Sequence, residues 1–336
     1  MRKLVVWIAV GLILVLITLI PPGLVTSQQP SLPAECEELA FSTEEDFLTY
    51  GPEPPDGNPI ISDGDLLGPN CVVCARNLDL VGLFDVPADL GLDAADVIDV
   101  EGYLVAFSTE LNSPNVGQFT AGDLLVTDGN IIPNVALTDP FGAGYDIGLD
   151  ALHFVGAMDN ILAFLDEAKQ MTRDDWLASP GTLAQMLARY EVDIWFSTEE
   201  TFKIVDVPVF LDGDLLSARD GVIVAGNNDL LPLSVPAGIP NRGVDFGLDA
   251  VTGNRAGDEG WIRFSTELLY EDELNFTDGD VLKYGNGVIR TNQSLVLCFE
   301  PKADFLGLDA LHMALEERPT RLYVPVILKI VEEAFQ

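Results

Sequence analysis

Three short stretches decide the fold, and one copy of them reads Phe107-Ser108-Thr109-Glu110, then Gly122-Asp123-Leu124-Leu125, then Gly148-Leu149-Asp150-Ala151. All three occur four times along the chain. Copies of the first begin at Phe41, Phe107, Phe196 and Phe264, copies of the second at Gly64, Gly122, Gly213 and Gly279, and copies of the third at Gly91, Gly148, Gly247 and Gly307. Such self-similarity is the signature of a repeat protein, whose neighbouring units share one core.

Each repeat alternates short runs of branched or aromatic residues with Asp, Gly and Asn. Tyr103–Phe107, Asp123–Val126 and Gly221–Ala225 are examples, and such runs are typical of β-strands joined by turns. With the run around Gly-Leu-Asp-Ala included, each repeat supplies about four strands, as in one blade of a β-propeller. We therefore expect an all-β fold, a four-repeat β-propeller-like ring, with another repeat architecture such as a solenoid as the alternative.

The four repeats lie near residues 39–98, 103–153, 193–252 and 261–312, within one domain of residues 39–312. The chain enters the pattern in mid-repeat and ends it with an extra Gly-Leu-Asp-Ala stretch. We expect this last strand to complete the first blade, because closing the ring removes exposed sheet edges.

Residues 158–190 interrupt the pattern between the second and third repeats. Apolar residues recur there at helical spacing, first as Ile161, Leu162, Phe164, Leu165 and Ala168 and then as Leu183, Met186, Leu187 and Tyr190. This spacing predicts a hairpin of two amphipathic helices. The hairpin either packs on one face of the repeats or serves as a lid or docking surface.

The N-terminus has the layout of a secretory signal peptide, with Arg2 and Lys3 before an apolar run over residues 4–20 and small residues near Ser27. Residues 1–27 are expected to be a cleaved signal or, if retained, a membrane anchor. Residues 28–38 then form a linker, and residues 313–336 a C-terminal tail. An exported protein, extracellular or at the cell surface, follows from this layout.

Four cysteines in an exported chain predict disulfides. A bond between Cys36 and Cys298 would join the first repeat to the fourth. Cys71 and Cys74 would lie about 10 Å apart on a regular strand, too far to bond to each other without a turn. A redox or zinc site at this pair is disfavoured because a second pair with the same spacing is missing.

The charge excludes one class of partner. The sequence has 54 acidic and 17 basic residues and a formal net charge of −37, which repels nucleic acid. Cations are more natural partners, and the unknown macromolecular ligand is expected to be an extracellular glycan or protein.

Two aspartates recur in every repeat, one after Gly64 and its equivalents and one within Gly-Leu-Asp-Ala. They are Asp65, Asp93, Asp123, Asp150, Asp214, Asp249, Asp280 and Asp309. One interpretation is that each accepts backbone N–H or hydroxyl hydrogen bonds, the latter from Ser42, Ser108, Ser197 or Ser265. The other is calcium, a hard cation that takes six to eight oxygen ligands.

The two histidines of the chain, His153 and His312, occupy the same place in the second and fourth repeats. Asp96 and Thr252 stand at that place in the other repeats. In a four-fold ring the histidines would face each other, so two imidazoles and a carboxylate could bind a transition metal. The alternative is that each histidine satisfies a local hydrogen bond.

The repeated Asp-Ala pairs, such as Asp93-Ala94 and Asp150-Ala151, together with a four-blade count, resemble hemopexin-type propellers, whose blades also begin with Asp-Ala. The repeats are also similar to those of exported bacterial surface proteins. The hemopexin-type resemblance implies a binding module with ions in its axial channel, rather than an enzyme.

We therefore expect a non-catalytic binding or surface-interaction protein, with calcium as its candidate stabilising ion. Established nucleophile, phosphate and zinc-protease motifs are missing from the sequence, and no catalytic residue is assigned. The alternative is a secreted glycan hydrolase that uses two carboxylates, with Glu110, Glu199, Glu200 and Glu267 as candidates.

Overall fold

The computed structural model describes residues 31–272, 274–303 and 305–314. The signal peptide predicted at residues 1–27 and nearly all of the predicted tail lie outside these ranges. The described chain is rich in strands, which form small antiparallel sheets with few helices. Within the same ranges, no helix combines the length and apolar character needed to cross a membrane.

Four sheets have four antiparallel strands each. The first contains β20 (Leu311–Met313), β1 (Leu39–Phe41), β4 (Leu66–Gly68) and β5 (Val72–Ala75). The second contains β6 (Ala94–Asp99), β7 (Leu104–Ser108), β8 (Leu124–Val126) and β9 (Ile131–Ile132). The third contains β10 (Leu152–Val155), β11 (Asp193–Phe196), β14 (Leu215–Ser217) and β15 (Ile223–Ala225). The fourth contains β16 (Val251–Thr252), β17 (Arg263–Phe264), β18 (Val281–Lys283) and β19 (Val288–Arg290).

Every sheet takes its first strand from one repeat and the other three from the next, because Gly-Leu-Asp-Ala leads directly into a new sheet. The strand that ends the pattern, β20, pairs with β1, so that Phe41 lies opposite Leu311 and Leu39 opposite Met313. The prediction that the last strand completes the first sheet is therefore confirmed.

The serines of Phe-Ser-Thr-Glu join each sheet to the next. Their hydroxyls donate to the leucine carbonyl of Gly-Leu-Asp-Ala at the start of the neighbouring sheet, from Ser42 to Leu92 at 3.4 Å, Ser108 to Leu149 at 2.8 Å, Ser197 to Leu248 at 2.6 Å and Ser265 to Leu308 at 3.1 Å. The fourth bond leads from the fourth sheet back to the first. The prediction that these serines donate to the repeated aspartates is wrong, because each hydroxyl donates to a leucine carbonyl of the neighbouring sheet instead.

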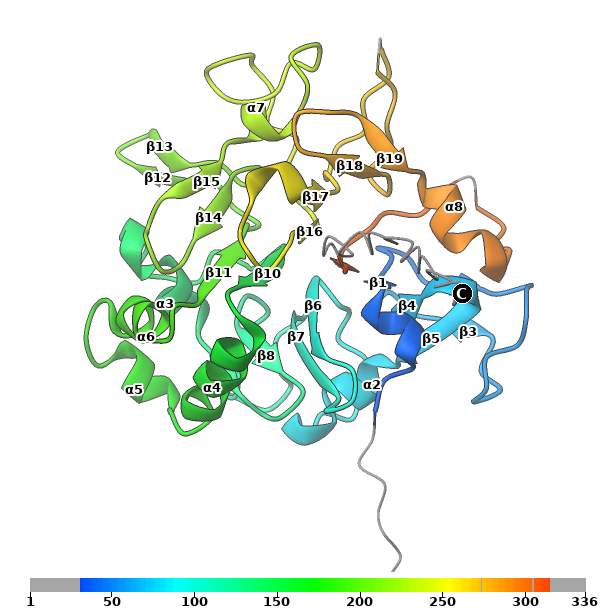
Figure 1. Ribbon diagram of the computed structural model, residues 1–336, viewed down its shortest axis with the longest axis horizontal. Helices are drawn as coiled ribbons and strands as arrows, with labels where there is room; N and C mark the ends of the chain where they lie inside the picture. The colour runs from blue at the N-terminus through cyan, green and yellow to red at the C-terminus, as the bar shows by residue number, and fades with distance from the viewer. Residues whose placement is uncertain (1–30, 273, 304, 315–336) are drawn as a thin grey trace, which may run out of the picture. The chain divides into compact units, whose positions relative to one another are not determined.

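The first strands of the sheets, β6, β10, β16 and β20, contact one another in this order, and β20 contacts β6. Figure 1 shows β6, β10 and β16 lying toward one another, with the later strands of each sheet farther out. Residues that precede these strands are therefore brought together although they are far apart in the sequence.

The aspartates after Gly64, Gly122, Gly213 and Gly279 lock the turn before the third strand. In the third repeat, Asp214 accepts from the backbone N–H of Leu211 at 3.0 Å and of Asn227 at 2.9 Å. Asp65, Asp123 and Asp280 accept from equivalent groups. Both oxygens of each carboxylate are thus used within one sheet, as the hydrogen-bond interpretation predicted for this half of the aspartates.

Short helices follow the fourth strands, where the sequence had suggested only hairpins. They are α2 (Asn77–Leu80), α3 (Asn134–Thr138), α7 (Asn227–Leu230) and α8 (Asn292–Val296). Each begins with an asparagine whose Oδ1 accepts the backbone N–H of the residue just before Gly-Leu-Asp-Ala, as from Ile147 to Asn134 at 3.1 Å. These asparagines position the chain entering each new first strand.

The interruption at residues 158–190 contains three helices, α4 (Met158–Ala168), α5 (Arg173–Leu177) and α6 (Thr182–Tyr190). The predicted helical pair corresponds to α4 and α6. The sequence prediction lacked α5, which is too short for a periodic pattern and is instead fixed by a capping box between Thr172 and Asp175. Trp176 of α5 donates its indole N–H to the Ile131 carbonyl at 3.1 Å, so the insertion packs on the second sheet.

The remaining elements lie between the second and third strands of two sheets or are single turns. Two hairpins are β2 (Phe47–Leu48) with β3 (Ile60–Ile61) and β12 (Phe202–Ile204) with β13 (Val207–Phe210). The 3₁₀ turns are Ala34–Glu37, Pro69–Cys71, Gly82–Phe84, Asp139–Phe141, Glu259–Trp261 and Leu297–Phe299.

Both disulfides differ from the predicted pairing. Cys36 bonds to Cys74, and Cys71 bonds to Cys298. The predicted bond between Cys36 and Cys298 is therefore wrong, because Cys36 lies in a 3₁₀ turn against β5, the strand that carries Cys74. The first and fourth repeats are nevertheless joined, through Cys71. The segment 28–38 is not a free linker over its described part, since Leu32 and Cys36 are buried.

The substitution Asp214→Asn tests whether the aspartate hydrogen bonds stabilise the turn before the third strand. It places an amide N–H₂ against one of two backbone N–H donors, so we expect a loss of about 1–3 kcal/mol in the free energy of unfolding. Urea denaturation followed by circular dichroism measures this loss. An unchanged midpoint would show that the carboxylate does not lock the turn.

Candidate cation site

Four buried aspartates meet where the first strands of the sheets contact one another. Asp93, Asp150, Asp249 and Asp309 each precede a first strand by one or two residues, and they are only 8, 6, 5 and 6% exposed. Asp150 is influenced electrostatically by both Asp93 and Asp249, and Asp249 by Asp309. The structure thus brings together the second half of the eight aspartates predicted as calcium ligands.

A glutamate from each sheet joins them. Each Phe-Ser-Thr-Glu ends in a glutamate whose side chain passes over the glycine of Gly-Leu-Asp-Ala in the same sheet. A Cβ added at Gly91 would lie 2.5 Å from the Glu110 Cδ, and Gly91 has a φ of +72°. Glycine is therefore required at this position for both space and backbone conformation. Glu44, Glu199 and Glu267 lie in the same way over Gly307, Gly148 and Gly247.

We call these eight residues the carboxylate cluster: Asp93, Asp150, Asp249 and Asp309 with Glu44, Glu110, Glu199 and Glu267. The Oδ2 atom of each of the four aspartates is buried, and no hydrogen-bond donor among the described residues reaches it. A buried carboxylate oxygen without a donor is costly. Because the same oxygen recurs in all four repeats, the cluster offers a set of acceptors that suits a positively charged ligand.

Three members of the cluster already form a compact ligand set. One carboxylate oxygen from each of Glu44, Asp249 and Asp309 can be chosen so that all three lie within 4.8 Å of one another. The two aspartates are buried whereas Glu44 is exposed, so an ion could reach this set from solvent. Oxygen donors alone favour a hard cation such as Ca²⁺ over zinc or copper.

Burial and mutual repulsion perturb the whole cluster. Burial, followed by repulsion from Asp278, raises the pKa of Glu44 to about 7. Burial and Asp63 raise the pKa of Glu110 to about 7, and burial and Asp212 do the same for Glu267. Burial, reinforced by neighbouring acids, raises the pKa of all four aspartates well above the usual value.

Sequence reasoning missed part of this site. Asp63, Asp212 and Asp278 lie close enough to the glutamates to raise their pKa by repulsion, while Ala121 takes the equivalent place in the second repeat. The signal was the Asp-Gly-Asp sequence in three of four repeats. The sequence indicates Glu110, Glu199 and Glu267 only as hydrolase candidates and does not single out Glu44, although each of the four ends a repeated Phe-Ser-Thr-Glu.

A second polar cluster lies three residues farther along the first strands. His312 Nδ1 is 2.8 Å from Asp96 Oδ1, and His153 Nδ1 is 3.4 Å from Asp96 Oδ2. The prediction that the histidines and Asp96 approach one another is confirmed. Arg255 binds both oxygens of the same carboxylate and donates to the Phe154 and Val97 carbonyls at 2.7 and 2.9 Å.

Arg255 makes this second cluster an ion-pair network. Burial alone would raise the pKa of Asp96, but Arg255, with His153 and His312, holds it well below its usual value. Burial lowers the pKa of His153 despite the neighbouring carboxylate. Because the guanidinium already supplies the positive charge, this arrangement favours a local ion-pair and hydrogen-bond network over the transition-metal hypothesis. A cavity of about 500 Å³ lies beside it and is lined in part by His153, Arg255 and His312.

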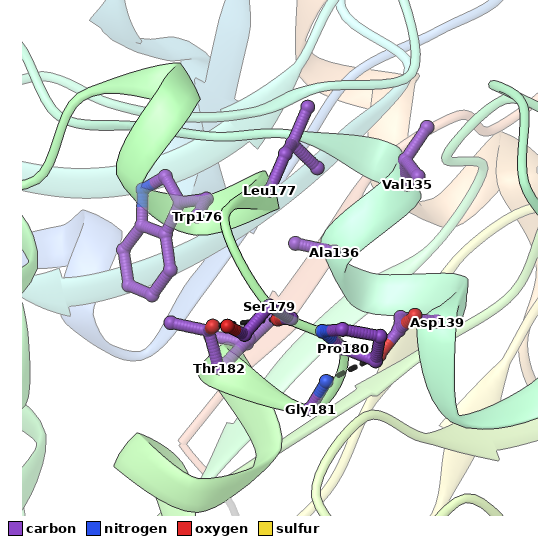
Figure 2. A pocket seen from close by; sticks show the side chains of 10 residues that line it. Val135, Ala136, Asp139, Trp176, Leu177, Ser179, Pro180, Gly181 and Thr182 are labelled. Atoms are coloured by element: carbon purple, nitrogen blue, oxygen red, sulfur yellow. Dashed lines mark hydrogen bonds between the residues drawn. The ribbon is translucent and has the colours of Figure 1, made fainter.

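A smaller cavity of about 200 Å³ lies between α3 and the helical insertion. Figure 2 shows its lining residues Val135 and Ala136 of α3, Trp176 and Leu177 of α5, and the turn at Ser179–Thr182. Its carboxylate, Asp139, already accepts the Gly181 N–H. The cavity is therefore a seam between packed helices, which supports the packing interpretation of the insertion.

The carboxylate cluster predicts how stability depends on pH without a cation. A carboxyl whose folded pKa is raised binds protons in the folded state that the unfolded chain has lost, so the free energy of unfolding falls as pH rises between the two values. From the glutamate pKa values of 4.5 and about 7, we expect the unfolding midpoint in EDTA to fall from pH 5 to pH 8. Differential scanning calorimetry measures it, and a rising midpoint would contradict the assignment.

The Asp96 network predicts the cost of leaving its carboxylate unpaired. Arg255→Met retains the apolar stem but removes the charge, so we expect a loss of about 3–5 kcal/mol in unfolding free energy. Arg189→Met is the matched control, because the Arg189 side chain is 58% exposed in a surface pair with Glu167. Equal effects of the two substitutions in urea denaturation would contradict the role of Arg255.

Searches for similar proteins found no matching protein family, curated protein or solved structure. The geometry of the carboxylate cluster is therefore the basis on which a function can be assigned.

Proposed function

We propose that this protein is an exported, non-catalytic binding module whose carboxylate cluster holds calcium. The observation that carries the proposal is the set of four buried aspartate oxygens without a donor, one from each repeat. A calcium ion at the compact set of Glu44, Asp249 and Asp309 would supply the missing partner for two of them and draw further oxygens from the cluster or from water.

We also propose that the four sheets form a four-bladed β-propeller. Support comes from the four serine-to-leucine hydrogen bonds, which lead from each sheet to the next and from the fourth to the first. The mutual contacts of β6, β10, β16 and β20 also support it. In this architecture the cluster lies at one end of the central axis, where loops from all four blades converge.

Export is supported by the two disulfides, which form and persist in oxidising compartments. Calcium is available at high concentration outside cells, so a weak site there can stay filled. A binding role is favoured over glycan hydrolysis because Glu110, Glu199 and Glu267 occupy equivalent positions. A hydrolase instead needs one acid and one base in different surroundings.

The comparison of Asp249→Asn with Asp214→Asn tests the calcium site. Both replace a buried aspartate by its closest neutral analogue, but only Asp249 belongs to the cluster. We expect Asp249→Asn to weaken calcium binding by about tenfold or more in calorimetric titration, while its unfolding midpoint in EDTA is unchanged or higher because repulsion is relieved. Asp214→Asn should lower the midpoint and leave the calcium affinity unchanged.

For the unmodified protein, calcium at about 100 times its dissociation constant should raise the unfolding midpoint by about 5 °C or more. Magnesium, which demands a smaller octahedral site, should raise it less. No calcium-dependent shift and no heat of binding at pH 8 would overturn the proposal.

A further inference from the structure

One group of carboxylates in the cluster is more compact than its counterparts. Each sheet contributes a glutamate and the aspartate before its first strand, and the preceding sheet contributes a second aspartate. Among the described residues, only the group of Glu44, Asp309 and Asp249 brings one oxygen from each member within 4.8 Å of the others. These two aspartates are 6 and 5% exposed, and no described donor reaches their Oδ2 atoms. The first sheet therefore has a local feature that makes its group compact.

The glycine of Gly-Leu-Asp-Ala is held differently at this group. Where the second and third sheets begin, its N–H donates to the aspartate two residues earlier, from Gly91 to Asp89 at 3.2 Å and from Gly148 to Asp146 at 3.0 Å. Where the first sheet takes its first strand, the Gly307 N–H instead donates to Oε2 of Glu45 at 3.0 Å. A glutamate from another part of the chain thus replaces the local aspartate.

The sequence explains this exchange. Leu306 is an extra residue, so Phe305 stands two residues before Gly307, where the other copies have Asp89, Asp146 and Asp245. The backbone N–H of Leu306 still donates to Asn292 at 2.9 Å, as the residue before the glycine does in the other copies. The turn therefore keeps its asparagine contact but has a phenylalanine in place of the aspartate.

The hydrogen bond between Glu45 and Gly307 fixes two ligands relative to each other. Glu44 precedes Glu45, and its side chain passes over Gly307, since a Cβ added there would lie 2.0 Å from the Glu44 Cδ. Asp309 follows Gly307 by two residues. One hydrogen bond therefore joins the segment that carries Glu44 to the segment that carries Asp309.

Ser265 positions the third ligand. Its backbone N–H donates to the Ala250 carbonyl and its hydroxyl to the Leu308 carbonyl, both at 3.1 Å. Ala250 follows Asp249 and Leu308 precedes Asp309, so these contacts hold the two aspartates across the junction of the fourth and first sheets. The serine hydroxyl makes the same contact at the other junctions. The contact of Glu45 is therefore the feature that distinguishes the compact group.

We propose that Glu45 is a positioning residue of the cation site, which holds Glu44 and Asp309 at ligand spacing through its hydrogen bond to Gly307. The proposal rests on the calcium function proposed above and explains why this group, among four equivalent ones, is the site. Ligating carboxylates depend on such supporting contacts, and the loss of one typically weakens metal binding by about 10- to 100-fold.

Calorimetric titration of the full chain with calcium chloride at pH 8 tests this role. Glu45→Leu removes the acceptor and introduces the residue that Leu111 and Leu268 supply at the same place in the second and fourth copies. We expect it to weaken calcium binding by about tenfold or more. Glu45→Gln removes the charge but keeps an acceptor oxygen, so it should weaken binding by less than about threefold, because the charge of an exposed side chain is screened.

Glu200→Leu is the matched control. Glu200 is the equivalent residue of the third copy and is exposed, as Glu45 is. Both belong to the same kind of turn, in which the hydroxyls of Thr43 and Thr198 donate to the carbonyls of Glu45 and Glu200 at 3.1 Å. The Gly148 N–H donates to Asp146, so this substitution removes the same charge without removing a glycine contact. We expect it to weaken calcium binding by less than about threefold.

A rescue variant tests the cause of the exchange. Phe305→Asp restores an aspartate two residues before the glycine, the place from which Asp89 and Asp146 accept. In the Glu45→Leu background it should recover most of the lost calcium affinity. In the otherwise unmodified protein it should change the affinity by less than about threefold, because Glu45 already accepts the Gly307 N–H.

The outcomes separate this inference from the proposed function. Equal weakening by Glu45→Leu and Glu200→Leu would overturn the role of Glu45, since charge alone would then account for it. Equal weakening by Glu45→Gln and Glu45→Leu, or failure of the rescue, would also overturn it. No binding by the unmodified protein would overturn the calcium function itself. Circular dichroism and thermal unfolding in EDTA confirm that each variant is folded.

Discussion

Four aspartates and four glutamates are held together where the first strands of the four sheets meet, and their mutual repulsion opposes folding. The neighbours that act most strongly on them are themselves acids. Carboxylates are seldom buried without a paired charge because desolvation is costly. The rest of the described structure must therefore stabilise the meeting of these strands strongly enough to tolerate that cost.

The repeated hydrogen bonds provide this stabilisation away from the cluster. The locking aspartate fixes the turn before the third strand, the asparagine of the short helix fixes the entry to the next first strand, and the serine hydroxyl ties one sheet to its neighbour. Asp214, Asn227 and Ser197 show all three in succession. The bond between Cys71 and Cys298 closes a loop of 227 residues, which reduces the entropy of the unfolded chain. Each contact positions the cluster without using its oxygens.

Much of this organisation could be predicted from the repeats, because the alternation of strand residues with turn residues such as Asp, Gly and Asn is a local feature of the sequence. The strand content followed from periodicity. The strand that completes the first sheet and the approach of His153 and His312 to Asp96 followed from the repeats together with the assumption of a closed four-fold ring. The pairing of Cys36 with Cys74 could not, since it depends on how a 3₁₀ turn lies against β5. Four of the eight aspartates accept backbone hydrogen bonds at turns and four belong to the carboxylate cluster, and this division also depends on which residues lie near them in three dimensions. Both kinds of aspartate recur with equal regularity, so repetition could not distinguish them.

In the two polar clusters along the first strands, buried aspartates have different charged neighbours. Asp96 and Asp93 lie on the same segment, three residues apart, and both are buried. Asp96 has a permanent counter-charge in Arg255, which also satisfies two backbone carbonyls. Asp93 and its equivalents have none from the residues that act on them most strongly.

A guanidinium at each cluster position would serve stability alone, as Arg255 does. Under the calcium proposal, carboxylates placed there instead, with glutamates that reach solvent, take their positive charge from outside the protein. The proposal therefore makes the stability of the carboxylate cluster depend on surrounding cations and protons, whereas the Asp96 cluster has its own counter-charge in Arg255.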